Sequence, residues 1–236
     1  MRNCLIVGQG GTFANSLISR LDKEGWKVCT FSSRKGSVKA EHVFEHYAFA
    51  YSNESASRVI ASCRPNVIIF LGAHDPAIAG DDHAAADHLH SYIMSLSTLL
   101  ICAGKQGVRH FVYLSSEAVF ENDYLTDIGE DTPATPASYR STVIYQGENI
   151  ASKYNTISNM EVTVVRLGGL CFRPANLNEC SDLCASMCLT AIRGEILHTN
   201  RKHYATALYD SDAAEALFRL VDAPTRQHQL YHVGSP

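Results

Sequence analysis

An apolar segment that runs straight into a glycine-rich turn constrains the fold of this chain more than any other feature. The segment Cys4-Leu-Ile-Val-Gly8 has the unbroken apolar character of a buried parallel strand, and a helical pattern follows the turn. Glycines let the backbone turn tightly and approach a ligand, while the first amides of a helix meet the negative charge of a pyrophosphate. The spacing Gly8-x-Gly10-Gly11-x-x-Ala14 therefore predicts a dinucleotide-binding turn. The residues expected at the cofactor are Gly8, Gln9, Gly10, Gly11, Thr12 and Phe13.

Apolar runs and helical patterns alternate along the rest of the chain. Strands are expected at 3–8, 26–32, 42–50, 67–71, 111–115, 162–167 and 229–233, and helices at 12–24, 54–63, 84–106, 138–153, 179–193 and 211–222. This alternation predicts an α/β fold, a doubly wound parallel sheet of the Rossmann type with helices on both faces. We expect residues 1–165 to form the NAD(P)-binding domain. Residues 166–236 are expected to complete the sheet and add a small, reduced C-terminal substrate lobe, all in one compact unit.

Charge and hydropathy exclude several classes of function. The net charge is −4 and no basic stripe runs along the chain, so we expect no nucleic-acid surface. No apolar run approaches the roughly 18 residues of a membrane span, and the chain enters a strand at once without a leader, so we expect a cytoplasmic protein. Cys180, Cys184 and Cys188 share one face of an expected helix. A buried stripe is favoured there over a metal site, with an oxidation-sensitive patch as the alternative.

The end of the second strand bears on the choice between the two nicotinamide nucleotides. An NAD site usually has an acidic residue there, which accepts a hydrogen bond from the ribose 2′-hydroxyl. The sequence instead holds Ser32, Ser33 and Arg34, followed by Lys35. Hydroxyls and a guanidinium suit a 2′-phosphate, although a solvated basic loop would have the same composition. The sequence therefore favours NADP(H) over NAD(H).

Four further motifs, in the expected order, carry a resemblance to a known family. They are Arg64-Pro-Asn-Val-Ile-Ile-Phe-Leu-Gly72-Ala73, Gly107-Val-Arg-His-Phe-Val-Tyr-Leu-Ser-Ser116, Val165-Arg166-Leu-Gly-Gly-Leu-Cys-Phe-Arg-Pro174, and Tyr209-Asp-Ser-Asp212-Ala-Ala-Glu-Ala with Leu230-Tyr-His-Val-Gly-Ser235. With the glycine turn, they resemble the extended short-chain dehydrogenase/reductase superfamily, in its NAD-dependent epimerase/dehydratase branch. The resemblance implies further cofactor contacts at Leu71, Gly72, Ala73, Ser115 and Leu167, and substrate contacts at His74 and Gly169.

Within that branch, short segments look most like dTDP-4-dehydrorhamnose reductases, which reduce the 4-keto group of a nucleotide sugar with a nicotinamide hydride. These segments are Arg64-Pro-Asn-Val-Ile-Ile69, Ser116-Glu-Ala-Val-Phe120 and Glu130-Asp-Thr-Pro133 before Tyr139. The resemblance implies an NADP(H)-dependent oxidoreductase or epimerase-like protein. Its substrate would be a nucleotide sugar or a related keto or hydroxy compound.

The family's catalytic residues carry over only in part. By resemblance, Ser116 would hydrogen-bond the substrate oxygen and Tyr139 would exchange a proton with it. A family lysine four residues after the tyrosine lowers the phenol's pKa from about 10 and holds the nicotinamide ribose, but Val143 stands there. Glu117 is a candidate for a carboxyl proton donor, with an exposed loop glutamate as the alternative.

Two alternatives remain open from the sequence. The missing lysine and the early end of the chain favour a catalytically silent NAD(P)-binding protein, with a regulatory or redox-sensing role. The stretch 74–90 is rich in His and Asp, but His88 and His90 do not share a helix face, so no metal site is expected. By resemblance, a homodimer would form through the helices expected at 84–106 and 138–153.

Overall fold

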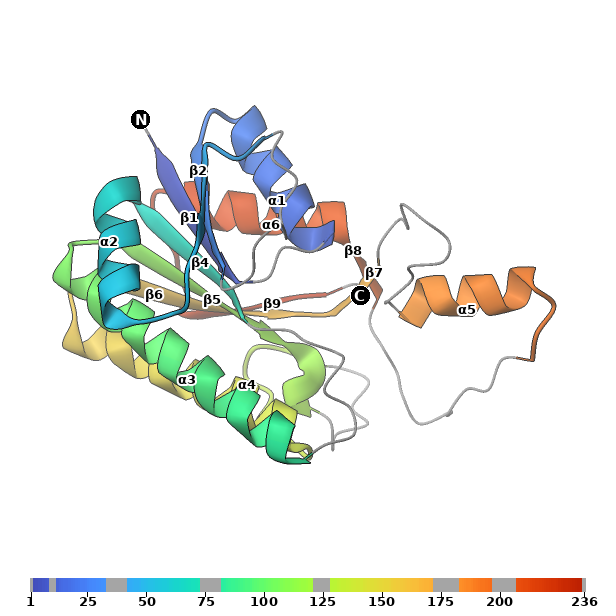
Figure 1. Ribbon diagram of the computed structural model, residues 1–236. Helices are drawn as coiled ribbons and strands as arrows, with labels where there is room; N and C mark the ends of the chain where they lie inside the picture. The colour runs from blue at the N-terminus through green and yellow to red at the C-terminus, as the bar shows by residue number, and fades with distance from the viewer. Residues whose placement is uncertain are drawn as a thin grey trace.

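Parallel strands form a single large sheet in the computed structural model, which describes residues 2–8, 12–32, 42–72, 82–120, 128–171, 183–196 and 207–234. Its seven strands follow the order β3-β2-β1-β4-β5-β6-β9, and neighbouring strands pair in parallel (Figure 1). The strands are β1 (Asn3–Gly8), β2 (Lys27–Ser32), β3 (Glu45–Ala48), β4 (Val67–Gly72), β5 (His110–Ser116), β6 (Glu161–Leu167) and β9 (Leu230–Val233). The predicted α/β fold with a doubly wound parallel sheet is confirmed.

Helices cover both faces of the sheet, and each face has its own apolar core. On one face lie α1 (Thr12–Lys23) and α6 (Asp210–Asp222), and on the other α2 (Asn53–Cys63), α3 (Asp82–Lys105) and α4 (Tyr139–Ile157) (Figure 1). The strands between them are buried on both sides, which explains their continuous apolar runs. The alternating apolar runs and helical patterns of the sequence therefore correspond to alternating strands and the helices that cover them.

The strand order reverses direction between β1 and β4. The chain first moves outward from β1 to β2 and β3, and then returns to the other side of β1 to build β4, β5, β6 and β9. At such a reversal the connections leave the carboxyl ends of the two central strands in opposite directions, and this opens a crevice above the sheet. The expected glycine turn begins at the end of β1, which places it at this crevice.

Helix ends lie within a few residues of the predicted ones, and capping side chains and a glycine define several of them. Ser52 caps α2 and Ser138 caps α4, and in each capping box the hydroxyl accepts from the backbone N–H three residues on. Helix α1 is followed by Gly25, which adopts a φ of 76° that glycine tolerates best. Helix α4 runs to Ile157, four residues beyond the predicted end.

Several short elements were not predicted. A turn of 3-10 helix, η2 (Glu117–Phe120), follows β5, and a separate two-stranded parallel sheet joins β7 (Gly169–Cys171) to β8 (Ala207–Tyr209). Helix α5 (Leu183–Ile192) confirms part of the helix expected at 179–193. Of the three cysteines expected on a buried stripe, Cys188 is exposed, so that expectation is wrong for this residue.

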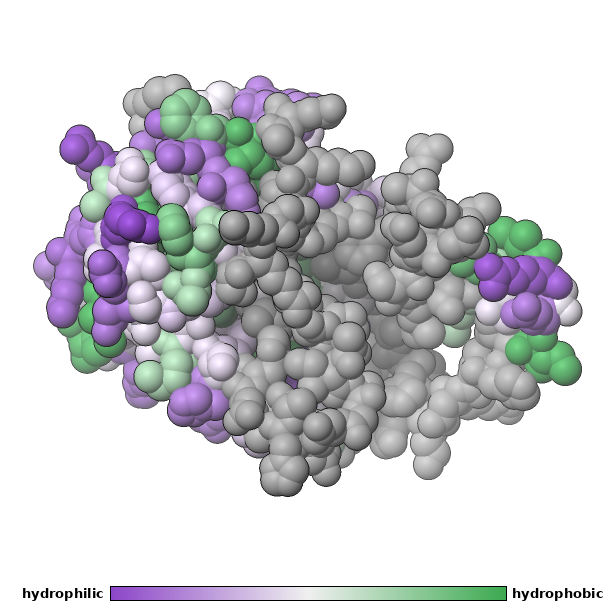
Figure 2. Space-filling model, in the orientation of Figure 1, coloured by the Kyte–Doolittle hydropathy of each residue, from purple (hydrophilic) through white to green (hydrophobic). Residues whose placement is uncertain are grey.

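The exposed end of α5 is also apolar. Ile192 and Ile196 are among the exposed large hydrophobic residues, and Figure 2 shows green side chains at this end of the molecule. Among the described residues, none of the helices is both long enough and apolar enough to cross a membrane.

Candidate functional site

The ends of β1 and β4 approach each other so closely that only glycine fits at the end of β1. Gly8 has a φ of 130°, and a Cβ there would lie 2.7 Å from the carbonyl oxygen of Gly72 and 3.3 Å from Cβ of Leu71. A side chain would both clash with backbone and strain the dihedral angle. The absence of side chains leaves backbone alone at the start of the expected cofactor turn. Backbone without side chains is what the close approach of a dinucleotide pyrophosphate requires.

A column of buried aromatic side chains supports the end of β4 from below. Gly72 also has a positive φ, 78°, and the ring of Tyr92 from α3 lies 3.1 Å from where its Cβ would stand. The Tyr92 hydroxyl is 2.6 Å from that of Tyr113, which donates in turn to the carbonyl of Ile144 on α4 at 2.9 Å. Burial raises the pKa of both phenols, so they stay protonated. The column fixes the cofactor edge of β4 relative to α4.

Helix α4 carries the candidate tyrosine and the position of the missing lysine on one face. Tyr139, Val143 and Gly147 follow at intervals of four, and helical geometry stacks such residues along one side. Val143 is 8% exposed and belongs to the core beneath the sheet, and Gly147 lies against Tyr113. Tyr139 is the first residue of the helix and is 57% exposed. The stripe therefore leaves the core at its amino end, where Tyr139 is exposed at the start of α4.

The candidate residues after β5 lie at the same edge. Ser116 is the last residue of β5 and the register partner of Leu167 on β6, and its hydroxyl accepts from the backbone N–H of Ala118 at 3.2 Å. This bond leaves the hydroxyl proton of Ser116 available to a ligand oxygen. Glu117 is half-buried at the start of η2. Since all strands are parallel, Gly8, Gly72 and Ser116 lie along one edge of the sheet.

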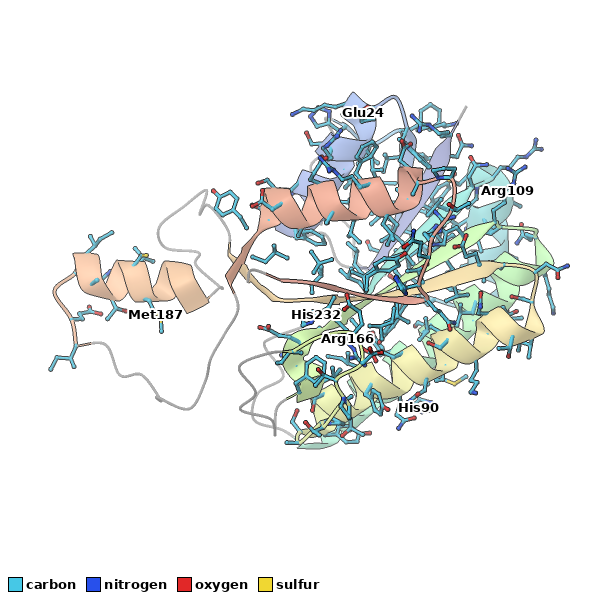
Figure 3. All side chains as sticks on the ribbon, turned by 180° about the vertical axis from the view of Figure 1, so that it is seen from behind. Glu24, His90, Arg109, Arg166, Met187 and His232 are labelled. Atoms are coloured by element: carbon cyan, nitrogen blue, oxygen red, sulfur yellow. The ribbon has the colours of Figure 1, made fainter. Side chains whose placement is uncertain are left out.

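A buried charged network lies directly beneath this edge and was missed by the sequence reasoning. The Ser115 hydroxyl donates to Glu148 Oε1 at 2.5 Å, and Arg166 donates to the same carboxylate through Nε at 2.9 Å and Nη2 at 2.8 Å. Both charged side chains are 5% exposed. Figure 3 shows Arg166 close to His232, its register partner on β9. An arginine inside the apolar run of β6 was the available signal, since a buried charge requires an opposite charge nearby.

Comparison with known families identifies the chain. The model of the NAD dependent epimerase/dehydratase family matches residues 4–234, almost the whole sequence. This chain belongs to that family.

Solved structures share the fold of this epimerase/dehydratase family member. The UDP-glucose 4-epimerase of Thermotoga maritima, solved with UDP-glucose, superposes with a TM-score of 0.81 at 18% identity, covering 99% of this chain and 77% of its own. The dTDP-glucose 4,6-dehydratase of Bacillus anthracis, solved with NAD, gives 0.78 at 18% identity, with coverage of 99% and 76%. The GalE-like L-threonine dehydrogenase of Cupriavidus necator gives 0.82 at 20% identity, with coverage of 99% and 78%. Among curated proteins, the search found no match.

Other predicted site residues of this family member fall at the same edge of the sheet. Ser32 ends β2 and is buried, Leu71 is half-buried, and Leu167 is buried in the core under α6. Phe13 is also a core residue, Thr12 opens α1, and Gly169 opens β7. Their contacts with a ligand stay predictions. Gln9, Gly10, Gly11, Ser33, Arg34, Ala73 and His74 lie outside the described residues. Within the part of the chain that is described, no three His, Cys, Asp or Glu side chains gather as metal ligands.

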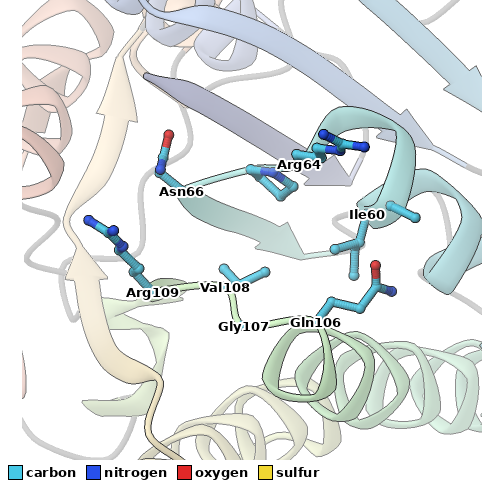
Figure 4. A pocket seen from close by; sticks show the side chains of 9 residues that line it. Ile60, Arg64, Asn66, Gln106, Gly107, Val108 and Arg109 are labelled. Atoms are coloured by element: carbon cyan, nitrogen blue, oxygen red, sulfur yellow. The ribbon is translucent and has the colours of Figure 1, made fainter. Parts of the chain in front are cut away.

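A pocket of about 520 Å³ lies at the opposite edge of the sheet and is distinct from this site. It is lined by the residues before β4 and β5, which are Ile60, Ala61, Arg64, Pro65, Asn66, Gln106, Gly107, Val108 and Arg109. Figure 4 shows Arg64 and Arg109 on opposite sides of the pocket, with their guanidinium groups pointing apart. The amino ends of parallel strands are not where this fold binds its nucleotides. The predicted cofactor site therefore remains the one at the carboxyl edge.

Proposed function

We propose that the chain is an NADP(H)-dependent oxidoreductase or epimerase-like enzyme that acts on a nucleotide sugar or a related keto or hydroxy compound. The observation that carries this proposal is the close approach of Gly8 to Gly72, because any Cβ would meet the Gly72 carbonyl and the expected cofactor turn therefore starts as backbone without a side chain. Membership of an NAD-dependent family supports it. A bound nicotinamide nucleotide supplies a centre that gives or accepts hydride. The chain's own residues hold it through Gly8, Leu71 and Gly72, and Ser116 stands at the same edge.

Preference for the phosphorylated nucleotide is the finer part of the proposal. Ser32 ends β2 where an acidic residue would bind an unmodified ribose, and Ser33 and Arg34 follow in the sequence. Calorimetric titration should give much tighter binding of NADPH than of NADH. Arg34→Ala should weaken NADPH binding at least about tenfold and leave NADH binding unchanged, since a charge-assisted pair contributes about 1.5–3 kcal/mol. Equal affinities for the two nucleotides would contradict the preference.

On the substrate, two side chains of this protein supply the proton chemistry. The Ser116 hydroxyl donates a hydrogen bond to the substrate oxygen, while the phenol of Tyr139 gives or takes the proton at that oxygen. Without a lysine at position 143, proton transfer by Tyr139 loses part of a contribution that is typically 10²–10⁴-fold. Tyr139→Phe should abolish turnover and leave nucleotide affinity unchanged, and Tyr145→Phe on another face of α4 is the matched control. Retained turnover would remove Tyr139 from the mechanism.

The substrate class follows from the resemblance of short segments to dTDP-4-dehydrorhamnose reductases. Residues 166–236 complete the sheet and add a reduced substrate lobe, and the substrate contacts are Gly169 in this part and His74 after β4. The fold by itself leaves the class open, since the structural neighbours include sugar-nucleotide enzymes and a threonine dehydrogenase. Nucleotide 4-keto sugars with NADPH, and threonine with NAD as the contrasting pair, form the first screen.

A second function is favoured by the burial of Val143. With an apolar side chain in the core at that position, the chain can hold a nucleotide without completing catalysis, as a regulatory or redox-sensing protein. Tight nucleotide binding without turnover of any screened substrate would support this second function. A homodimer through α3 and α4 is compatible with both proposed functions. Met94, Ile101 and Ile157 are exposed hydrophobic residues on these helices. Sedimentation of the purified chain decides the oligomeric state.

A further inference from the structure

Three elements of the fold meet in the buried network of Ser115, Glu148 and Arg166. Ser115 belongs to β5, Glu148 to α4 and Arg166 to β6, and all three are less than a tenth exposed. The carboxylate of Glu148 receives three hydrogen bonds, two from the guanidinium and one from the hydroxyl. This bidentate geometry is directional, so it fixes the orientation of the three elements as well as their distance.

Each candidate catalytic residue is attached to one of the elements that the network joins. Ser116 follows Ser115 in the chain, and Tyr139 begins the helix that carries Glu148. The guanidinium of Arg166 lies 4.9 Å from the centre of the Phe120 ring, and Phe120 ends the short helix η2 that Glu117 begins. The hydrogen bonds and this ring contact therefore hold Ser116, Glu117 and Tyr139 in one frame.

Stability alone does not account for a buried ion pair at this place. Removing two charges from water is costly, and replacing such a pair with apolar residues of similar size is often neutral or stabilising. The arginine is also incompletely satisfied, because its buried Nη1 bonds to no atom of the described chain, and neither does the buried Nε2 of the neighbouring His232. An apolar core would avoid both unpaired nitrogens, and what it would lack is the directional link between strand and helix.

We propose that Glu148 and Arg166, with Ser115, are positioning residues for the reaction at the carboxyl edge. The network holds the end of β5 and the start of η2 in register with α4, so that the Ser116 hydroxyl and the Tyr139 phenol face the same substrate oxygen. This inference rests on the proposed function for its chemical meaning. Its structural claim, that the network orders residues 116–120, is independent of any substrate.

The amide of Ala118 is a direct reporter, because its hydrogen is bonded to the Ser116 hydroxyl oxygen. We would measure hydrogen exchange of residues 116–120 in the wild type, Ser115→Ala, Glu148→Gln and the double variant Glu148→Leu/Arg166→Met. Exchange at Ala118 should rise at least about tenfold in Glu148→Gln and in the double variant, and less in Ser115→Ala. The double variant should regain the thermal midpoint that Glu148→Gln loses, because its core is apolar. Glu215→Gln, at an ion pair near the surface of α6, is the control.

Two results would overturn the inference. The first is unchanged exchange at Ala118 in Glu148→Gln. The second is a double variant that recovers wild-type exchange together with its stability, which would make the network ordinary packing. Ser115→Ala keeps the test decisive if the double variant does not fold.

Failure of this inference is distinguishable from failure of the proposed function. NADPH affinity should be unchanged in Glu148→Gln and in the double variant, since the turn at Gly8 lies on other strands, and a wild type that binds no nucleotide would refute the proposed function alone. With an active substrate in hand, kcat should fall about tenfold or more in the double variant while KM changes little, because misplaced groups lose transition-state contacts first.

Discussion

Acidification should destabilise the fold through one buried side chain, His110. This residue begins β5 and is 2% exposed, and its Nε2 lies 3.0 Å from the hydroxyl of Thr163 on β6. Burial, and then the positive charge of Arg226, lower the pKa of His110 from 6.5 to about 4, while Glu161 opposes this effect. Between these two pKa values, His110 is therefore neutral in the folded protein and protonated in the unfolded chain.

The magnitude follows from the two pKa values. Because the folded-state pKa is lowered, the contribution is fully present above pH 6.5 and is lost as the pH falls toward 4. Each pKa unit corresponds to about 1.4 kcal/mol, so the whole effect is about 3 kcal/mol, of which about 2 kcal/mol is lost by a pH of about 5. For a domain with a typical stability of about 5–15 kcal/mol, this is a large share.

Urea unfolding at about pH 7.5 and about pH 5 measures the loss, with the fluorescence of the single tryptophan, Trp26, as reporter because it is 4% exposed. His110→Gln keeps a hydrogen-bonding group near Thr163 but does not titrate. The variant should lose about 2 kcal/mol less than the wild type between the two conditions. His90→Gln, at an exposed position on α3, is the control for replacing a histidine. If wild type and His110→Gln lose equal free energy, the burial argument is refuted.

Further outcomes test the site and the core. Gly8→Ala should weaken nucleotide binding more than about tenfold by calorimetry, because its Cβ would stand 2.7 Å from the Gly72 carbonyl; retained affinity would place the nucleotide elsewhere. Gly147→Ala should cost about 1–3 kcal/mol in thermal unfolding, since the new Cβ would lie 2.2 Å from the Tyr113 hydroxyl, and Tyr113→Phe should recover part of it. Cys188 should react with a thiol reagent in the folded protein, while the thiols that are buried among the described residues, Cys4, Cys29, Cys63 and Cys102, react only on unfolding; mass mapping that finds the reverse order would contradict this burial.

The main elements could be predicted because each has a local signal. The run Val67–Leu71 is apolar without interruption, which marks a central parallel strand, and Gly25 marks the end of the first helix. The glycine at position 8 was predicted at the start of a cofactor turn; the structure places it at the end of β1, where its close approach to Gly72 requires glycine, and the turn itself stays a prediction. Strands of three residues, such as β7 and β8, carry too short a pattern to be recognised.

The buried network could not be predicted because its partners meet only in the folded chain. Glu148 and Arg166 are 18 residues apart on a helix and a strand, and nothing local to either one indicates the other. The hydroxyl of Ser115 is bonded to Glu148, and the cofactor contact predicted for this residue stays a prediction. Val143 was predicted to stand where the family has its lysine, and this stays a prediction. That it lies in the core, between α4 and the sheet, is information that only the packing supplies.

The pairing of α1 with α6 has a consequence for how the chain is made. Ser16 donates to Asp210, and Arg20 to Glu215 at 2.5 Å, across separations of 194 and 195 residues. At a synthesis rate of about 5–20 residues per second, α6 is made roughly 10–40 s after α1. During that time the apolar side chains of α1 that later face α6 have no partner from α6. The helix that follows the expected nucleotide turn is thus among the first elements to be made and among the last to be fully packed. We therefore expect a nascent chain to bind nucleotide only once α6 is made.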